Sequence, residues 1–196
     1  MADNFSDYVE HPRYGYAPFI TGLNPVSDSK GTVWPHWHSP KQCRIPNTAI
    51  TANTELHNTG LGHVTHYFDV DRECVDCGRR FLFFAREQQY WYETLRFSLS
   101  ANCIRCTDCR KSERDLKSLR YQYEKILHQA VRSEKQQLKL AEYAIMLVER
   151  ADAGQRLVEL ARCCLNRIPD DSRICKQATF RNLHSRSKTL LDATAR

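Results

Sequence analysis

The C-terminal part of the chain, residues 113–196, shows the hydrophobic spacing of amphipathic helices. Apolar residues recur there every three or four positions, with polar residues between them. Four stripes can be followed: Leu116, Leu119, Tyr123, Ile126 and Ala130; Leu138, Ala141, Ile145 and Val148; Leu157, Leu160, Ala161, Cys164, Leu165 and Ile168; Ile174, Ala178 and Leu183. Gly154 is placed to end one helix and Pro169 another, and residues 170–172 can cap the last. The pattern predicts an antiparallel array of three or four helices.

Residues 63–112 follow a different pattern, a short apolar run and then helical spacing. The run Phe81-Leu82-Phe83-Phe84 predicts a strand. Helical spacing then predicts a helix over residues 86–95. The side chains that share its apolar face are Phe84, Gln88, Trp91, Tyr92 and Leu95. We expect this aromatic face to form the core of the central part of the chain.

Residues 1–62 show neither period. Six of the seven prolines and five of the seven glycines lie in this segment, and both residue types interrupt regular structure. We therefore expect three parts: an irregular wrap over residues 1–62, an organised centre over residues 63–112, and a helical tail over residues 113–196.

Composition and charge fit this division. With 41% hydrophobic and 27% charged residues, the chain is typical of soluble globular proteins. The net charge is +6, and the excess lies in the tail, where 17 Lys and Arg face 11 Asp and Glu. Such interleaved charge favours a solvated helical surface over a nucleic-acid footprint.

The nine cysteines call for an explanation other than disulfide bonds. The acidic start resembles no secretory signal, and no stretch reaches the ~18 consecutive apolar residues that a membrane span needs. We therefore expect a cytoplasmic protein with no membrane partner, and thiols stay reduced in the cytoplasm. Since nine is also odd, metal binding or catalysis is the better explanation for clustered cysteines.

Two Cys-x-x-Cys pairs predict a metal clamp. Cys74 and Cys77 are followed by Gly78, which permits the tight turn of a metal knuckle, and Cys106 and Cys109 repeat the spacing. Four soft sulfur ligands in two such pairs favour one tetrahedral zinc ion.

Cys103 leaves an alternative open, because Cys103 and Cys106 have the same spacing. We prefer Cys109, since the charged, helix-favouring run that follows it places Cys106 and Cys109 at a helix N-terminus, where thiolates are stabilised. Cys103 as a substitute ligand is the main alternative, and a thiol redox pair is a minor one.

The knuckles belong to a longer stretch that resembles a known family. The likeness is carried by Cys74-x-x-Cys77-Gly78, Phe81, Phe83, Glu87-Gln88-Gln89, Trp91-Tyr92-Glu93 and Arg105-Cys106-x-x-Cys109-Arg110, with Ile45-Pro46-Asn47-Thr48-Ala49-Ile50 and His57-Asn58 upstream. Over residues 44–112 the chain resembles the bacterial probable zinc-ribbon, or treble-clef-like, domain. The resemblance implies a small α+β module in which the two pairs hold one zinc ion. It implies no activity.

A zinc ion with four thiolate ligands has no open position for water or substrate, so we expect a structural ion and a protein that is not an enzyme. Glu87 near a helix start is expected to complement the helix dipole rather than to act as a base. A metal-dependent nuclease is a minor alternative, because His63 and His66 precede the first knuckle but no histidine lies between Cys77 and Cys109.

The N-terminal segment holds one further candidate site. His36, His38 and Cys43 offer three metal ligands, although the paired tryptophans Trp34 and Trp37 more often fasten a loop or form an interaction surface. Whether these three residues form a second site stays open.

The sequence therefore favours a zinc-stabilised protein-interaction protein, an adaptor or an inhibitor of another protein. The partner is expected to bind the helical tail or the N-terminal aromatic segment. The alternative is a nucleic-acid-binding protein that uses the basic tail together with Arg79, Arg80, Arg110 and Lys111 beside the knuckles.

Overall fold

The computed structural model describes residues 5–26, 33–58, 64–151 and 154–194. The chain divides into two compact units, Met1–Lys111 and Ser112–Arg196. The first unit contains both the Pro- and Gly-rich segment and the central segment. The fold is α+β, with small β-hairpins and a four-cysteine cluster in the first unit and packed helices in the second.

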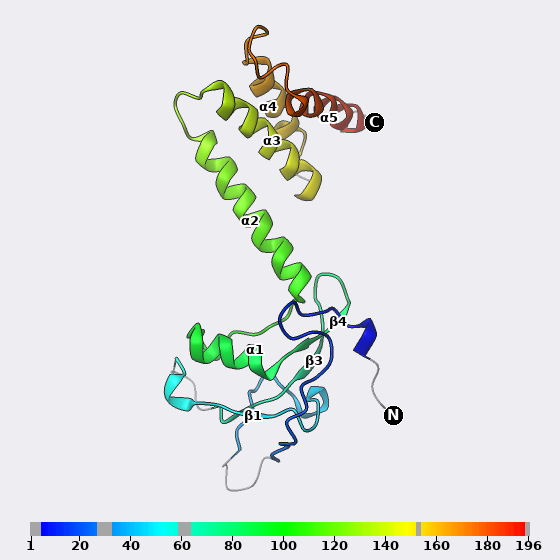
Figure 1. The fold of residues 1–196 in the computed structure, drawn as a ribbon, viewed down its shortest axis with the longest axis vertical. Coiled ribbons are helices and arrows are strands. Elements are labelled where there is room, and N and C mark those ends of the chain that lie inside the picture. Colours follow the sequence, from blue (N-terminus) through cyan, green and yellow to red (C-terminus); the bar gives the residue numbers. More distant parts are fainter. Residues whose placement is uncertain (1–4, 27–32, 59–63, 152–153, 195–196) are drawn as a thin grey trace. The chain divides into compact units, whose positions relative to one another are not determined.

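A β-hairpin and a short helix form the centre of the first unit (Figure 1). Strand β3 (Val70–Glu73) pairs antiparallel with β4 (Arg80–Phe83), so that Val70 lies opposite Phe83. The strand predicted from the aromatic run is therefore present as β4. Each outer edge of the hairpin is paired at one position, because Val9 bridges to Phe81 in β4 and Arg44 bridges to Val70 in β3. The N-terminal segment thus occupies part of each edge of the sheet.

The remainder of this segment has little regular structure. A second two-stranded sheet pairs β1 (Ile50–Thr51) with β2 (His66–Tyr67), and three short 3-10 turns lie at Phe5–Asp7, Lys41–Cys43 and Thr54–Leu56. Elements of two or three residues cannot satisfy many backbone groups by themselves.

The predicted helix at residues 86–95 is present in part. Helix α1 (Ala85–Gln89) continues as a π-helical turn, Tyr90–Thr94, in which the backbone N–H of Leu95 donates to the carbonyl of Tyr90 (2.9 Å). Phe84, Gln88 and Tyr92 are buried as expected, but Leu95 is 42% exposed. The prediction for Leu95 was wrong because the wider π turn rotates it away from the face that regular helical spacing assigns to it.

A buried carboxylate connects three segments of the first unit. Asp69 is 2% exposed, and its side chain accepts hydrogen bonds from the backbone N–H groups of Phe19 (2.9 Å) and Ala85 (2.6 Å). Its own carbonyl accepts from the N–H of Ile45 (2.8 Å). Burial raises the pKa of Asp69 to about 6, although the two N–H donors act in the opposite direction. Asp69 thus ties the N-terminal segment to the start of α1.

The first unit has two neighbouring apolar clusters, and Trp91 packs against both. One contains Val9, Val70, Cys74, Phe81, Phe83, Cys103 and Cys106, and the other contains Ala52, Val64, Tyr67, Ala85, Tyr92 and Leu99. Three of the buried members of the first cluster are cysteines. The candidate metal site is therefore part of the core.

His36 packs on the second cluster as a neutral imidazole. It is 3% exposed and stacks on Tyr92, with ring centroids 5.0 Å apart. Its Nδ1 accepts the N–H of His38 (3.1 Å), so the proton lies on Nε2, which donates to the carbonyl of Leu99 (2.7 Å). Burial is the main reason that the pKa of His36 falls to about 4.

The second unit is helical, as predicted. Helix α2 (Thr107–Leu127) begins in the first unit and continues into this one, followed by α3 (Glu134–Ala151), α4 (Gln155–Asn166) and α5 (Ala178–Thr194). The last three pack against one another (Figure 1). Their core contains Leu140, Ala141, Ala144, Ile145, Ala161, Cys164, Leu165 and Leu183, with Tyr123, Ile126 and Leu127 of α2 packed against it.

Two predicted helix ends were wrong. Gly154 does not end a helix; it is the N-cap of α4. Residues 170–172 do not cap α5, which begins only at Ala178, because Ser172 Oγ accepts the N–H of Ile174 (3.1 Å) and closes an isolated turn. Ser133 and Gln136 do mark a start: Ser133 Oγ accepts the N–H of Gln136 and the Gln136 side chain accepts the N–H of Ser133, which is a capping box at the start of α3.

We predict that a fragment comprising residues 112–196 folds without metal. Its apolar cluster is built entirely from α2 to α5, and four packed helices bury such a face without help from the first unit. Circular dichroism should show a helical spectrum and a cooperative thermal transition that a zinc chelator leaves in place. An unfolded fragment, or a transition that the chelator abolishes, would contradict the division into two units.

We also predict that His36 stays neutral through most of the acid range. In an unfolded chain a histidine titrates near pH 6.5, whereas the folded pKa of His36 is about 4. A depressed histidine pKa means that the stability gained from the neutral ring is complete above pH 6.5 and is lost as pH falls towards 4, by about 1.4 kcal/mol per pH unit. An NMR titration of the His36 ring protons should show the midpoint near 4 in the folded protein and near 6.5 in urea. A folded-state midpoint near 6.5 would contradict the burial of this ring.

Candidate metal centre

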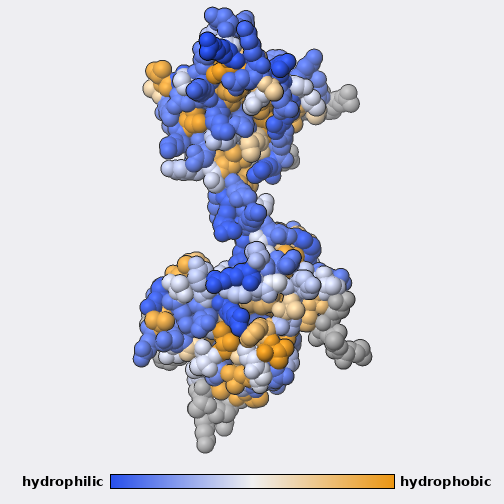
Figure 2. Space-filling view, viewed as in Figure 1, coloured by the Kyte–Doolittle hydropathy of each residue, from blue (hydrophilic) through white to orange (hydrophobic). Residues whose placement is uncertain are grey.

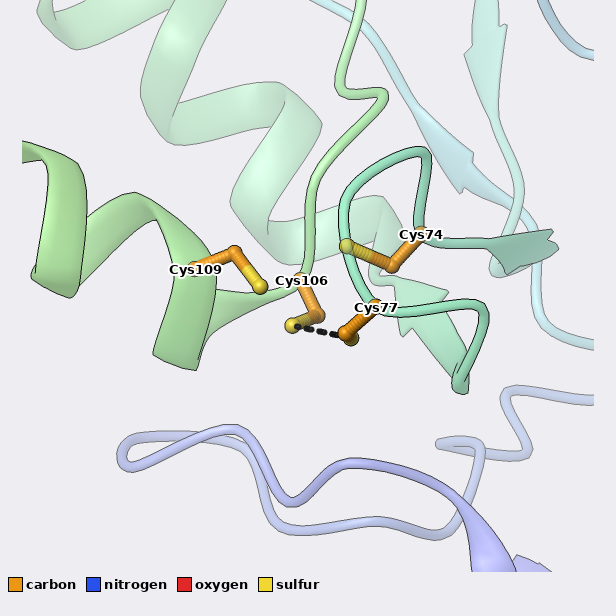
Figure 3. Close-up of side chains that lie close together, drawn as sticks. All are labelled: Cys74, Cys77, Cys106 and Cys109. Carbon is orange, nitrogen blue, oxygen red and sulfur yellow. Dashed lines mark hydrogen bonds between the residues drawn. The ribbon is translucent and has the colours of Figure 1, made fainter. Parts of the chain in front are cut away.

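The first cysteine pair lies on the turn between β3 and β4. Cys74 follows β3 directly, its carbonyl accepts the N–H of Gly78 (2.9 Å), and its N–H donates to the carbonyl of Arg79 (3.0 Å). Gly78 has φ +69°, a conformation that costs a glycine little and other residues more. The predicted turn thus forms, and it brings the side chains of Cys74 and Cys77 to the same side (Figure 3).

The second pair lies at the start of α2. Cys106 directly precedes the helix and Cys109 lies in its first turn, where the N–H of Arg110 donates to the carbonyl of Cys106 (3.0 Å). A backbone hydrogen bond from Val75 to Ile104 (3.1 Å) joins the stretches that carry the two pairs. Figure 3 shows the four side chains pointing towards one another.

The four sulfur atoms fit one tetrahedral metal ion. They all lie within 4.8 Å of one another, and the Sγ atoms of Cys77 and Cys106 are 3.8 Å apart. Tetrahedral zinc with Zn–S bonds of about 2.3 Å separates its sulfur ligands by about 3.8 Å. The donor set, four thiols without a carboxylate or a histidine, is the one that structural zinc prefers.

The cysteines of the site differ in exposure, and the surroundings of Cys74 and Cys77 lower their pKa. Cys74 and Cys106 are 2% and 0% exposed, whereas Cys77 is exposed. Burial raises the pKa of Cys74, but N–H groups of Cys106, Cys77 and Asp76 outweigh it and bring the pKa to about 6. The backbone and side chain of Arg79 lower the pKa of Cys77. Knuckle N–H groups that point at sulfur favour the ionised ligand.

Cys103 lies outside this group. Its side chain is 1% exposed inside the apolar cluster, and its Sγ donates a hydrogen bond to the carbonyl of Arg105 (3.5 Å). Burial raises the pKa of Cys103 to about 12. Cys103, three residues before Cys106, is therefore a neutral thiol in the core and is not one of the four sulfurs that converge.

Two reciprocal ion pairs connect the knuckles. Arg79 of the first donates to Asp108 in α2 (2.8 Å), and Arg105 beside the second donates to Asp76 (2.8 Å). All four side chains are at least one-third exposed, so each pair contributes at most about 1 kcal/mol. Their structural effect is that the charges beside the clamp are neutralised within the fold.

Glu87 has a different role from the one expected. It is 5% exposed, and its Oε1 accepts from Arg110 Nη1 (2.7 Å) and lies 3.4 Å from His11 Nε2. Burial raises the pKa of Glu87, but His11 and Arg110 together lower it below its usual value. A carboxylate held ionised in this way is a structural ion pair between α1 and the start of α2. Sequence spacing gives no sign of this pairing.

The arginines proposed to contact nucleic acid beside the knuckles are already paired. Arg79 pairs with Asp108, Arg80 with Asp71, and Arg110 with Glu87. Lys111 is exposed. Phosphate binding at this place would have to break two or three internal ion pairs, and the geometry therefore does not favour a footprint beside the clamp.

The other histidine and cysteine candidates do not assemble a second site. Both ring nitrogens of His36 are used by backbone groups, so His36 cannot ligate a metal together with His38 and Cys43. His66 lies in β2 with its Nδ1 next to Thr65 Oγ1 (3.0 Å), and His63 lies outside the described residues. Within the described ranges, the four cysteines are the one group suited to a metal ion.

Comparison with known proteins agrees with the geometry. A family model described as a probable treble clef domain matches residues 68–118, which run from the start of the β3–β4 hairpin to the middle of α2. No curated protein and no solved structure gave a match. No helix among the described residues is both long and apolar enough to cross a membrane. The hairpin knuckle, the helix-borne second pair and the four converging sulfurs all lie within the stretch 68–118, which matches the model of the probable treble clef domain family.

Proposed function

We propose that the chain is a non-enzymatic interaction protein in which one structural zinc ion stabilises the first unit, and in which that unit presents an apolar surface to a partner protein. The ion is held by Cys74, Cys77, Cys106 and Cys109. A reducing compartment such as the cytoplasm suits this role, since all nine cysteines are free.

The position of the sulfurs in the core supports a structural ion. Cys74 and Cys106 pack with Phe81 and Phe83, so a bound ion is surrounded by core side chains on that side. Four protein ligands leave no coordination position for water, which a hydrolytic zinc ion needs. Structural zinc contributes about 10–16 kcal/mol to folding in small modules, as much as the whole stability of a typical domain.

The observation that carries the interaction role is a set of exposed apolar side chains in the N-terminal segment. We call it the N-terminal apolar surface; its exposed fractions are Phe19 48%, Ile20 61%, Leu23 40%, Val26 71%, Trp34 57% and Trp37 46%. The second unit, by contrast, exposes only Tyr121 and Val131 among its large apolar side chains in the described residues. Figure 2 shows hydrophobic surface gathered on part of the first unit. The N-terminal segment is therefore the better candidate than the tail for a protein interface.

These side chains are exposed on an ordered backbone. The N–H of Phe19 donates to Asp69, the N–H of Thr21 donates to the carbonyl of Asn47 (2.7 Å), and the carbonyl of Leu23 accepts from Ala49 (3.1 Å). The segment is thus fixed while its apolar side chains face water. Aromatic and aliphatic anchors that are held in place before binding are the features that give protein interfaces their affinity.

The zinc proposal predicts unequal effects for two neighbouring cysteines. Cys74→Ser should lose the ion and the fold of the first unit, because three thiolates and a hydroxyl bind zinc far more weakly. Cys103→Ala should keep one zinc per chain and lower the free energy of unfolding by about 1–3 kcal/mol, through a lost core contact. Metal analysis and NMR amide dispersion measure both effects. Equal loss of zinc in the two variants would show that Cys103 is a zinc ligand.

The interface proposal predicts that two apolar side chains matter for binding but not for folding. Ile20→Ser combined with Val26→Ser should leave zinc content and thermal unfolding unchanged, since both side chains are more than half exposed. Proteins captured with the wild type from nuclease-treated native extract, and identified by mass spectrometry, should be lost with the double variant.

Val131→Ser is the matched control, because Val131 is 87% exposed and lies in the second unit. The control variant should capture the same proteins as the wild type. If the double variant captures the same partners with equal yield, or if the control loses them too, the N-terminal apolar surface is not the interface.

A further inference from the structure

The two units use their arginines in opposite ways. In the first unit every arginine has a partner within the chain: an acidic side chain, a backbone carbonyl or an aromatic ring. These are Arg13, Arg44, Arg72, Arg79, Arg80, Arg86, Arg96, Arg105 and Arg110. The positive charge of this unit is therefore largely committed to its own fold.

In the second unit, helices α4 and α5 and the connection between them carry exposed basic side chains that form no ion pair with any described residue. They are Arg156, Arg162, Arg167, Arg173, Lys176, Arg181 and Lys188. Arg186 is the exception, because it pairs with Glu149 of α3. We propose that these seven side chains, which we call the basic surface, bind the phosphate backbone of a nucleic acid.

The charge balance of this part of the unit is positive. Residues 155–194 contain eight Lys and Arg against four Asp and Glu, whereas residues 134–150, which form most of α3, contain three of each. Residues 113–133, which include most of α2, contain five Lys and Arg against three Asp and Glu, but Lys117 pairs there with Glu113 and Arg132 donates to backbone carbonyls. Among the described residues of the tail, the larger number of exposed cations without an ion pair therefore lies on α4, α5 and their connection. Concentrated, unpaired positive charge is the electrostatic footprint of a nucleic-acid-binding surface.

Helix geometry groups four of the seven charges, two on α4 and two on α5. Arg156 and Arg167 are eleven residues apart, close to three full turns of α4, and therefore share one face. Arg181 and Lys188 are seven residues apart, which is two turns of α5. The buried side of α5 carries Leu183 and Ser187. Cations repeated along a face at intervals of one or more turns match an extended array of phosphates better than a single anion.

The chemistry of the surface favours nucleic acid over an acidic protein. Five of the seven side chains are arginine, whose planar guanidinium binds phosphate through two parallel hydrogen bonds. A protein interface would also need apolar anchors, and no large apolar side chain is exposed among the described residues of α4 and α5. This inference rests on the second unit alone and is independent of the N-terminal apolar surface.

The test is a salt titration of the full-length, zinc-loaded chain. Fluorescence anisotropy would follow binding to a mixed-sequence DNA duplex of about 20 base pairs and to a single-stranded RNA of the same length, between about 25 and 300 mM salt. We expect log affinity to fall linearly with log salt, by about 0.9 per phosphate contact for the duplex and about 0.7 for the single strand. The two probes show which nucleic acid the surface prefers.

Charge-matched double variants locate the contacts. Arg156→Gln with Arg167→Gln, and Arg181→Gln with Lys188→Gln, should each lower the magnitude of the duplex slope by about 2 and weaken binding at about 100 mM salt roughly tenfold or more. Arg114→Gln with Lys135→Gln removes the same charge from exposed positions of α2 and α3. This control should change the slope by less than about 0.5. Circular dichroism confirms that each variant keeps its helices.

Four outcomes would overturn the proposal. The first is no binding of either probe at the lowest salt, and the second is an equal loss of affinity in the control and basic-surface variants. The third is a loss of affinity only in the variant Arg79→Gln with Arg80→Gln at the clamp. The fourth is binding of polyglutamate as tight as binding of the duplex. The last would show a surface for acidic polypeptides rather than for phosphates. A loss of probe affinity only in the two basic-surface variants would support the proposal.

Discussion

The convergence of four sulfur atoms, where the β3–β4 turn meets the start of α2, is the constraint on which the first unit depends. Its strands have two to four residues and its α-helix five before the π turn. Elements this short are marginal in water without a further constraint. A metal ion bound to Cys77 and Cys106 closes the loop that contains β4, α1 and the π turn, and so restricts the unfolded chain as well as stabilising the folded one. Without a cation, four thiolates in one place would repel one another strongly.

Buried polar side chains supply what regular secondary structure does not. Asp69 accepts hydrogen bonds from the backbone N–H groups of Phe19 and Ala85, which lie in segments that no strand pairing joins. The Gln88 side chain donates to the carbonyls of Phe68 (2.5 Å) and Phe83 (2.9 Å). Glu87 and Arg110 bury a charge pair between α1 and the residue after Cys109. Burying such groups is costly unless they are paired. A loop-rich unit nevertheless gains from them, because Asp69 and Gln88 each satisfy two backbone groups with one side chain, and the Glu87–Arg110 pair joins α1 to α2.

The parts of this structure that depend on local spacing could be predicted from the sequence. The two knuckles, the strand β4 and the helices of the second unit follow from residues a few positions apart. The parts that depend on distant partners could not. Nothing local shows that Glu87 meets Arg110, that Asp69 meets Phe19, or that Cys103 points into the core while Cys106 points at the other sulfurs. The π turn escaped prediction because hydrophobic periodicity assumes a constant helical twist. Gly154 was misassigned since glycine is found at both ends of helices.

Charge pairing separates the roles of the two units. In the first, arginines neutralise acidic side chains around the clamp or cover aromatic rings, and the side chains left for a partner are apolar. In the second, most large apolar side chains pack in the helical core, Tyr121 and Val131 being the exposed ones among the described residues, and the exposed surface of α4 and α5 is rich in cations. Side chains that are buried or paired within a folded unit are not accessible to a partner, so the exposed side chains set what each unit can bind. Four thiol ligands leave no coordination position open on a zinc ion, so under the function proposed above the metal would act on binding only by holding in place the backbone that presents the first of these surfaces.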